Sequence, residues 1–334
     1  MVFKINRRSF LEGSAAMLAT GSSRASSQEV KRIVDIGLVS DKGSKAFITE
    51  ANKVGGVEAV TVYTTPGKPG LEYSNFPRGL RRVTVVMKFA PSSCGEGIYK
   101  EIIAGHCDAT LIEFAQKVNA DGRAIIVRPF HEFNFHVHPH SVYAFGNDPN
   151  DFIPAWRHLV ELLREHTRLI EFDWNPNRES FIGPGIYPRG GATAGIAEFY
   201  PGDQWVDWVS FSTYNRGFLT RSDQRVHSFA EDLRPAYRIM DRIAGPSVRF
   251  AISETSTTSL GGVNKEAWFR ALFDSIATEF TRIEIVNFFL ISKVNANEAP
   301  ASWALRDKVE YEMFKRLLGE FRTRMGMPAP PLFS

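Results

Sequence analysis

The stretch AIIVRPFHEFN, residues 124–134, begins as a strand and ends in groups that can do chemistry. An apolar run that stops at Pro129 is typical of a short strand, because proline cannot continue the hydrogen-bond ladder of a sheet. His131 and Glu132 follow within three residues. We therefore expect Glu132 just beyond the carboxyl end of a strand.

A second stretch, VRFAISE at residues 248–254, repeats this arrangement. Its apolar residues alternate, as in a strand with two different faces, and it closes on Glu254. Two carboxylates at the ends of two separate strands indicate an acid and a nucleophile that face one substrate.

Strand-like segments alternate with helix-like ones along the chain. Several of the intervening segments have apolar residues spaced near 3.6, for example Trp156, Leu159, Val160 and Leu163. Alternation of this kind in a chain of this length predicts a single (β/α)8 TIM barrel, in which functional groups gather at the carboxyl ends of the strands. The eight predicted strands are VDIGLVS (34–40), EAVTVYT (58–64), RVTVVMKF (82–89), AIIVRPF (124–130), IEFDWN (170–175), VDWVSFSTYN (206–215), VRFAISE (248–254) and IEIVNFFL (283–290).

Composition and charge agree with one large domain that does not bind nucleic acid. The chain has 334 residues, is 43% hydrophobic and carries a formal charge of +3. Four of its basic residues lie in residues 1–25, against one acid, so the remainder has as many acidic as basic residues. No basic stripe remains that would bind phosphates.

Residues 1–25 resemble a twin-arginine export signal. Arg7 and Arg8 are followed by Phe10 and Leu11, and the apolar run at 15–19 is too short to cross a bilayer. We expect a signal peptide at 1–25 that the twin-arginine translocase exports. The catalytic domain at 26–334 would then be periplasmic or secreted, without stable membrane association. The alternative is an amphipathic tail that stays attached.

The chain has two cysteines, Cys94 and Cys107. An oxidising compartment permits a disulfide between them, and two separate, partly buried thiols are the alternative.

The residues near the strand ends fit retaining glycoside hydrolysis. That reaction needs one protonated carboxyl and one ionised carboxyl about 5 Å apart, and Glu132 and Glu254 supply the pair. Arg128 is expected to hold a carboxylate in its charged form, His131 to bind sugar hydroxyls and Tyr214 to hydrogen-bond Glu254. The competing interpretation is a capped turn at His131 and a surface carboxylate at Glu254.

Aromatic and amide side chains at other strand ends favour the sugar site, because sugar rings stack on aromatic faces and hydroxyls pair with amides. The candidate substrate-binding residues are Arg128, His131, Asn134, Trp174, Asn175, Tyr214, Phe288 and Phe289.

Taken together, these stretches resemble glycoside hydrolase family 26, best known for β-mannanases. The resemblance implies a (β/α)8 fold, retention of configuration and no metal, with Glu132 as acid/base and Glu254 as nucleophile. It also implies that His131, Arg128, Trp174 and Tyr214 belong to the active site. It runs through IIAGHCDATLIEFAQ (102–116), RPFHEFN (128–134), DFIPAWRHLVELLR (151–164), FDWNPN (172–177), YPGDQWVDWVSFSTYN (200–215), AISET (251–255) and KEAWF (265–269).

Three departures from the family pattern concern the substrate. Residues 135–146 read FHVHPHSVYAFG where the family has a glycine and a nearby tryptophan. Phe288 and Phe289 stand where strand eight usually carries a tryptophan, and Ser256 replaces a usual glycine. β-1,4-Mannan or glucomannan is the leading substrate. β-1,3-Xylan, mixed-linkage β-glucan, an exopolysaccharide, or a carbohydrate-binding role with weak turnover are the alternatives.

The HVHPH stretch offers His136, His138 and His140, which could join His131 around a metal. Alternating side chains share one side only in an extended segment, and no Cys or Asp stands close by. We therefore expect these histidines to line a sugar cleft and expect no cofactor. A metal-binding periplasmic protein is the rival interpretation.

Overall fold

The computed structural model describes residues 32–67, 72–89, 97–135, 138–142, 146–177, 195–215, 227–293 and 301–334. Residues 1–31 lie outside the described part, and with them the predicted export signal and the expected start of the catalytic domain at residue 26. Cys94 and His136 also lie outside it. Cys107 is buried and is not a free thiol, and the bridge to Cys94 stays a prediction.

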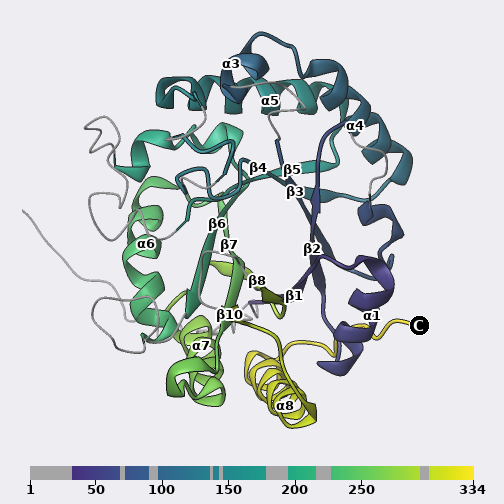
Figure 1. Ribbon diagram of the computed structural model, residues 1–334, viewed down its shortest axis with the longest axis vertical. Coiled ribbons are helices and arrows are strands. Elements are labelled where there is room, and N and C mark those ends of the chain that lie inside the picture. Colours follow the sequence, from purple (N-terminus) through teal and green to yellow (C-terminus); the bar gives the residue numbers. More distant parts are fainter. Residues whose placement is uncertain are drawn as a thin grey trace, which may run out of the picture. The chain divides into compact units, whose positions relative to one another are not determined.

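Eight parallel strands close into a barrel in chain order, β1 to β8, with β1 pairing with β8. Figure 1 shows the strands as an inner ring with helices around it. All eight predicted strands and the predicted barrel are confirmed. The strands are β1 (Asp35–Ser40), β2 (Ala59–Thr64), β3 (Arg82–Met87), β4 (Ile125–Pro129), β5 (Ile170–Trp174), β6 (Trp208–Asn215), β7 (Arg249–Thr257) and β8 (Ile283–Phe288).

Helices cover the outside of the strands because each has one apolar face. In α5 the predicted stripe of Trp156, Leu159, Val160 and Leu163 is fully buried. The helices are α1 (Gly43–Lys53), α3 (Ile98–Ile103), α4 (Asp108–Asp121), α5 (Phe152–His166), α6 (Phe229–Ile243), α7 (Lys265–Thr278) and α8 (Lys308–Met325). A two-stranded sheet, β9 (Ser292–Lys293) with β10 (Ala301–Ser302), follows β8.

Strand β7 is longer than the sequence indicated. Glu254 was expected as its last residue, but the strand runs on to Thr257 because residues 255–257 pair with residues 213–215 of β6. The register between β6 and β7 shifts so that Ser212 lies opposite Glu254 and Ser253 has no partner residue. A bulge of this kind turns the following side chain away from the regular alternation.

Among the described residues, none of the helices combines the length and the hydropathy needed to cross a membrane.

Candidate active site

Glu132 is held by an unusual backbone at the end of β4. Phe130 and Glu132 both have φ of 50°, in the left-handed region that side chains other than glycine rarely adopt. Such a residue costs about 1–3 kcal/mol and persists only where its surroundings fix it. The Phe130 ring is fully buried, 5.3 Å from the ring of Tyr99, and the Glu132 N–H donates to the Asn175 carbonyl oxygen at 2.8 Å.

The carboxylate of Glu132 lies among hydrogen-bond donors. Its Oε2 lies 3.4 Å from Nε2 of His138. Burial acts to raise the pKa of Glu132, but hydrogen bonds from His138, Ser212 and Asn177 outweigh it, so that its pKa is lowered from the usual value. In the ligand-free site Glu132 is therefore ionised at neutral pH.

Glu254 accepts hydrogen bonds from two tyrosines. The hydroxyl of Tyr63, near the end of β2, contacts Oε1, and the hydroxyl of Tyr214, near the end of β6, lies 2.6 Å from Oε2. Burial, followed by the charge of Glu254, raises the pKa of both tyrosines well above the usual value, so both remain protonated donors.

The two glutamates belong to one site. The ring of Tyr63, which contacts Glu254, lies 5.7 Å from the ring of His131, the residue before Glu132. The charge of Glu132 also contributes to raising the pKa of Tyr63 and of Tyr214. We call Glu132, Glu254, Tyr63 and Tyr214 the glutamate site. Sequence reasoning missed Tyr63, although its place near a strand end was the same signal that identified Tyr214.

The carboxylate that Arg128 binds is that of Asp173. Its Nε lies 2.6 Å from Oδ2 of Asp173 in the neighbouring strand β5, and both side chains are almost fully buried. The Ser210 hydroxyl donates to the same oxygen at 2.9 Å. The pair forms in the barrel interior because Arg128 and Asp173 lie on strands that are hydrogen-bonded to each other.

The side-chain amides of Asn134 and Asn175 form hydrogen bonds that connect the segments after β4 and β5. Asn175 accepts from the backbone of Glu132 and donates to Ser253 Oγ at 2.9 Å, so it links Glu132 to the β7 bulge. Asn134 exchanges two hydrogen bonds with the backbone of Asn177, at 2.6 and 2.9 Å. Asn134 and Asn175 are buried in these contacts, and their binding of sugar hydroxyls stays a prediction.

Three of the candidate aromatic residues are buried as well. Trp174 is fully buried and its indole N–H donates to the Phe199 carbonyl oxygen. Phe288 is fully buried against Phe314 in α8. Phe289 is 2% exposed and lies 6.0 Å from the Tyr214 ring. Stacking of a sugar on any of these rings stays a prediction.

A tryptophan that sequence reasoning missed lies beside the glutamate site. Trp303 comes directly after β10, and its ring lies 5.0 Å from that of Tyr214. It packs with Val39 and Phe289. A tryptophan thus reaches this end of the barrel from the loop after β8 and not from β8 itself, which no local pattern in the sequence indicated.

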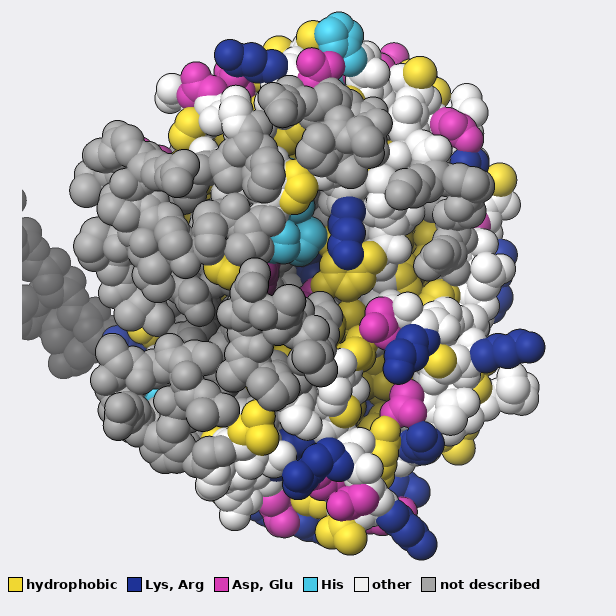
Figure 2. Space-filling model, viewed as in Figure 1, with side chains coloured by type: hydrophobic (Ala, Val, Ile, Leu, Met, Phe, Trp, Pro, Cys, Tyr) yellow, Lys and Arg dark blue, Asp and Glu magenta, His cyan; other side chains and the backbone are white. Residues whose placement is uncertain are grey.

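Three histidines lie next to Glu132, and Figure 2 shows histidine side chains in a hollow at the centre of one face. The ring centroid of His131 lies 4.4 Å from that of His138 and 4.9 Å from that of His140. We call these three residues the histidine cluster. Burial, followed by the neighbouring histidines, lowers the pKa of His131 well below the usual value, and burial lowers that of His140 to about 3.

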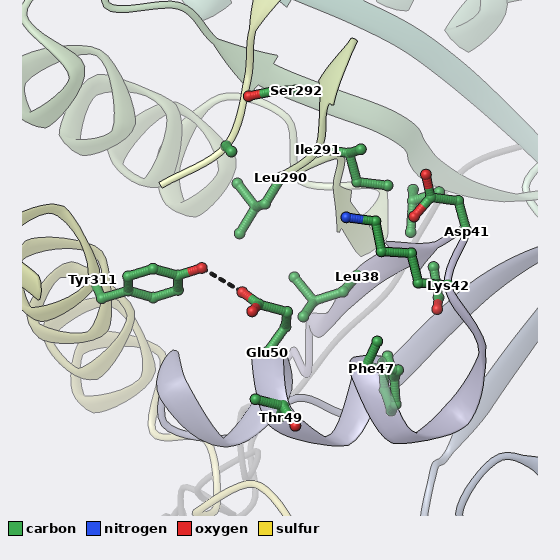
Figure 3. A pocket seen from close by; sticks show the side chains of 14 residues that line it. Leu38, Asp41, Lys42, Phe47, Thr49, Glu50, Leu290, Ile291, Ser292 and Tyr311 are labelled. Carbon is green, nitrogen blue, oxygen red and sulfur yellow. Dashed lines mark hydrogen bonds between the residues drawn. The ribbon is translucent and has the colours of Figure 1, made fainter. Parts of the chain in front are cut away.

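A separate cavity of about 420 Å³ lies between α1 and the segment after β8. Lys42, Glu50 and Tyr311 are among its lining residues, and the Tyr311 hydroxyl donates to Glu50 (Figure 3). The cavity shares Val39 and Ile291 with the hydrophobic packing around Tyr63 and Tyr214, but neither glutamate of the glutamate site lines it.

Comparison with known proteins gives one curated relative. Endoglucanase H of Acetivibrio thermocellus is 29% identical over 186 residues, which is 55% of this chain and 19% of that protein. The match thus spans about a fifth of the relative's length. No family model matches the chain.

Several solved structures share the fold. The catalytic domain of the GH26 endo-β-1,4-mannanase from Bacillus sp. JAMB-750 has a TM-score of 0.61 at 15% identity, covering 89% of this chain and 88% of that one. A modular endo-β-1,4-mannanase from Cellulomonas fimi has a TM-score of 0.60 at 17% identity, covering 85% and 70%. GH26C from Muricauda sp. gives 0.58 at 13%, covering 86% of each chain. The resemblance to glycoside hydrolase family 26 is confirmed at the level of the fold.

Proposed function

We propose that this protein is a retaining glycoside hydrolase that cleaves a β-linked polysaccharide, with Glu254 as nucleophile and Glu132 as acid/base. The observation that carries the proposal is the different surroundings of the two carboxylates in one barrel mouth. Glu254 accepts hydrogen bonds from two tyrosine hydroxyls, whereas Glu132 lies beside the ring of His138. Two carboxyl groups in distinct environments are what a retaining mechanism requires.

In the first step Glu254 attacks the anomeric carbon and forms a glycosyl ester, while Glu132 gives its proton to the departing oxygen. In the second step Glu132 removes a proton from water, which displaces Glu254 and restores both residues. The first step needs Glu132 protonated, so the substrate must displace the donors that lower its pKa in the free site. The lowered pKa suits the base role of the second step.

The leading substrate is β-1,4-mannan or glucomannan. Two of the structural neighbours are named endo-β-1,4-mannanases, and the curated relative is named an endoglucanase, so a polymer with both mannose and glucose fits the two sets of names. β-1,3-Xylan, mixed-linkage β-glucan and exopolysaccharide are substrates of the same reaction class. We further propose that residues 1–25 direct export through the twin-arginine translocase and that residues 26–334 act in the periplasm or outside the cell.

The test is hydrolysis of a panel of purified β-glycans by the full-length chain, with product sizes read by chromatography. Proton NMR of the first product gives its anomeric configuration. Release of β-configured reducing ends supports the proposal. Release of the α-anomer would contradict the retaining mechanism, and binding of glycans without any release would favour a carbohydrate-binding protein.

A further inference from the structure

The histidine cluster brings three imidazoles together within ligand distance of one another. His131, His138 and His140 each offer one ring nitrogen, and these three atoms lie within 4.8 Å of one another. The rings of His138 and His140 are stacked at 9° with centroids 5.2 Å apart. Turns bring them there, since the backbone N–H of Ser141 donates to the carbonyl oxygen of His138 at 2.9 Å. The extended segment that sequence reasoning required is therefore not needed.

Hydrogen bonds to oxygen acceptors set which nitrogen of two rings carries the proton. Nε2 of His140 lies 2.7 Å from the carbonyl oxygen of His131, which can only accept, so Nε2 donates and Nδ1 holds the lone pair. Nε2 of His138 faces the Glu132 carboxylate at 3.4 Å in the same way. Metal-binding histidines commonly donate their other ring N–H to a carbonyl or carboxylate, which is the arrangement of both rings here.

Two ring nitrogens of the cluster are buried without a partner. Nδ1 of His131 and Nδ1 of His140 have no hydrogen-bond partner among the described residues. Buried polar atoms in native proteins are nearly always paired, so an unpaired ring nitrogen on each of two adjacent rings needs an explanation. A bound cation would satisfy both atoms at once.

We propose that His131, His138 and His140 form a binding site for one divalent transition-metal ion of the zinc class. Imidazole nitrogens suit zinc, copper and nickel, whereas magnesium and calcium prefer oxygen ligands. Around tetrahedral zinc, with bonds of about 2.0–2.1 Å, ligand nitrogens lie about 3.4 Å apart, so the cluster must contract on binding. His138, whose side chain is 22% exposed, is the ring with room to move.

Occupation of this site would restrain the acid/base residue, a consequence that rests on the proposed function. An ion on Nδ1 of His138 would hold its Nε2–H against Oε2 of Glu132. The departing sugar oxygen needs access to that carboxylate, so the fixed histidine competes with it. Zinc would then inhibit hydrolysis, and a chelator would restore it.

The experiment uses the untagged full-length chain after removal of metal by chelation and desalting. Zinc is titrated by calorimetry, and cobalt(II) by visible absorption, which becomes intense when the ion is tetrahedrally coordinated. We expect one ion per chain, about tenfold or more weaker binding in His138→Gln and in His140→Gln, and unchanged binding in His106→Gln. His106 is the matched control because its exposed ring pairs with Glu101 away from the cluster. Thermal melting without metal shows that each variant is folded. If His140→Gln does not fold, zinc binding in His138→Gln alone tests the site, because the side chain of His138 is partly exposed.

A wild-type chain that takes up no stoichiometric ion overturns the site, and so does equal zinc binding in His138→Gln and His106→Gln. Zinc binding is measured without substrate, so the result tests the metal site independently of the proposed function. Once glycan hydrolysis has been measured, full activity at saturating zinc would contradict the prediction that zinc inhibits the reaction. Absence of hydrolysis in both metal-free and zinc-loaded protein would instead count against the proposed function.

Discussion

The hydroxyl of Tyr214 lies 2.6 Å from Oε2 of Glu254, and the hydroxyl of Tyr63 contacts the other oxygen of the same carboxylate. The two donors come from β6 and β2, which are not neighbours in the barrel. Glu254 is thus fixed from two sides, and its orientation depends on the closed barrel and not on β7 alone.

Tyr63→Phe and Tyr214→Phe should each lower kcat/KM for glycan hydrolysis by about ten- to a hundredfold. Each change removes one hydrogen bond to a charged group, worth about 1.5–3 kcal/mol. Initial rates on the best substrate of the panel give the measurement. Tyr311→Phe is the control, because its hydroxyl also donates to a carboxylate, that of Glu50, outside the glutamate site. Equal effects of all three variants would contradict a specific role for Tyr63 and Tyr214.

Glu254→Ala should reduce hydrolysis by orders of magnitude on polymer and activated aryl glycoside alike, because both steps lose their covalent partner. Glu132→Ala should still react with an aryl glycoside that has a good leaving group, but the intermediate persists without its base. The measurement is pre-steady-state release of the aryl group together with intact-protein mass. Neither a burst nor an adduct in Glu132→Ala, with near-normal turnover in Glu254→Ala, would overturn the assigned roles.

Arg128→Met should destabilise the fold by about 3–5 kcal/mol, because it leaves the Asp173 carboxylate buried without its cation. The double variant Arg128→Met with Asp173→Asn removes the charge too, and much of the free energy of unfolding should return. Urea denaturation gives both values. Equal loss in the single and double variants would show that the pair matters through packing and not through charge.

Hydrolysis should survive thorough chelation, since the proposed chemistry uses carboxylates only. The assay compares untreated, chelated and zinc-supplemented protein on one glycan. Activity that is lost on metal removal and restored by stoichiometric metal would refute the metal-free mechanism and would give the histidine cluster a catalytic role.

Replacement of Arg7 and Arg8 by lysine should leave an unprocessed precursor in the cytoplasm. Cell fractionation with immunodetection gives the ratio of precursor to mature protein. Normal amounts of mature protein outside the cytoplasm would show that the leader does not use the twin-arginine route.

The pattern of apolar residues was enough to predict the strands. Side chains that alternate between the two faces of a strand leave a period of two in the sequence, which can be read directly. It also predicted where Glu132 would be, since Pro129 ends β4. It did not predict that β7 continues past Glu254, because that extension comes from pairing with β6. The Arg128–Asp173 pair and the Tyr63 contact depend on which strands become neighbours or face each other, and closure of the barrel decides this.

The backbone around Glu132 was beyond prediction as well. A left-handed φ at Phe130 and Glu132 is unfavourable for the residues themselves and is imposed by packing. A further turn, in which Ser141 N–H donates to the His138 carbonyl oxygen, lies within the histidine cluster, so spacing along the chain could not indicate that the three rings meet.

The start of the loop after β4 is held in place independently of the rest of the loop. Asn134 is tied to the backbone of Asn177, and Glu132 to that of Asn175, so the start of the loop is anchored to the segment after β5 at two points. Further along the loop His138 contacts the Glu132 carboxylate, so a change at that residue alters the surroundings of the carboxylate while these two anchors remain. For the proposed hydrolase, the loop beyond Asn134, apart from His138 and His140, is therefore the natural place to redesign specificity.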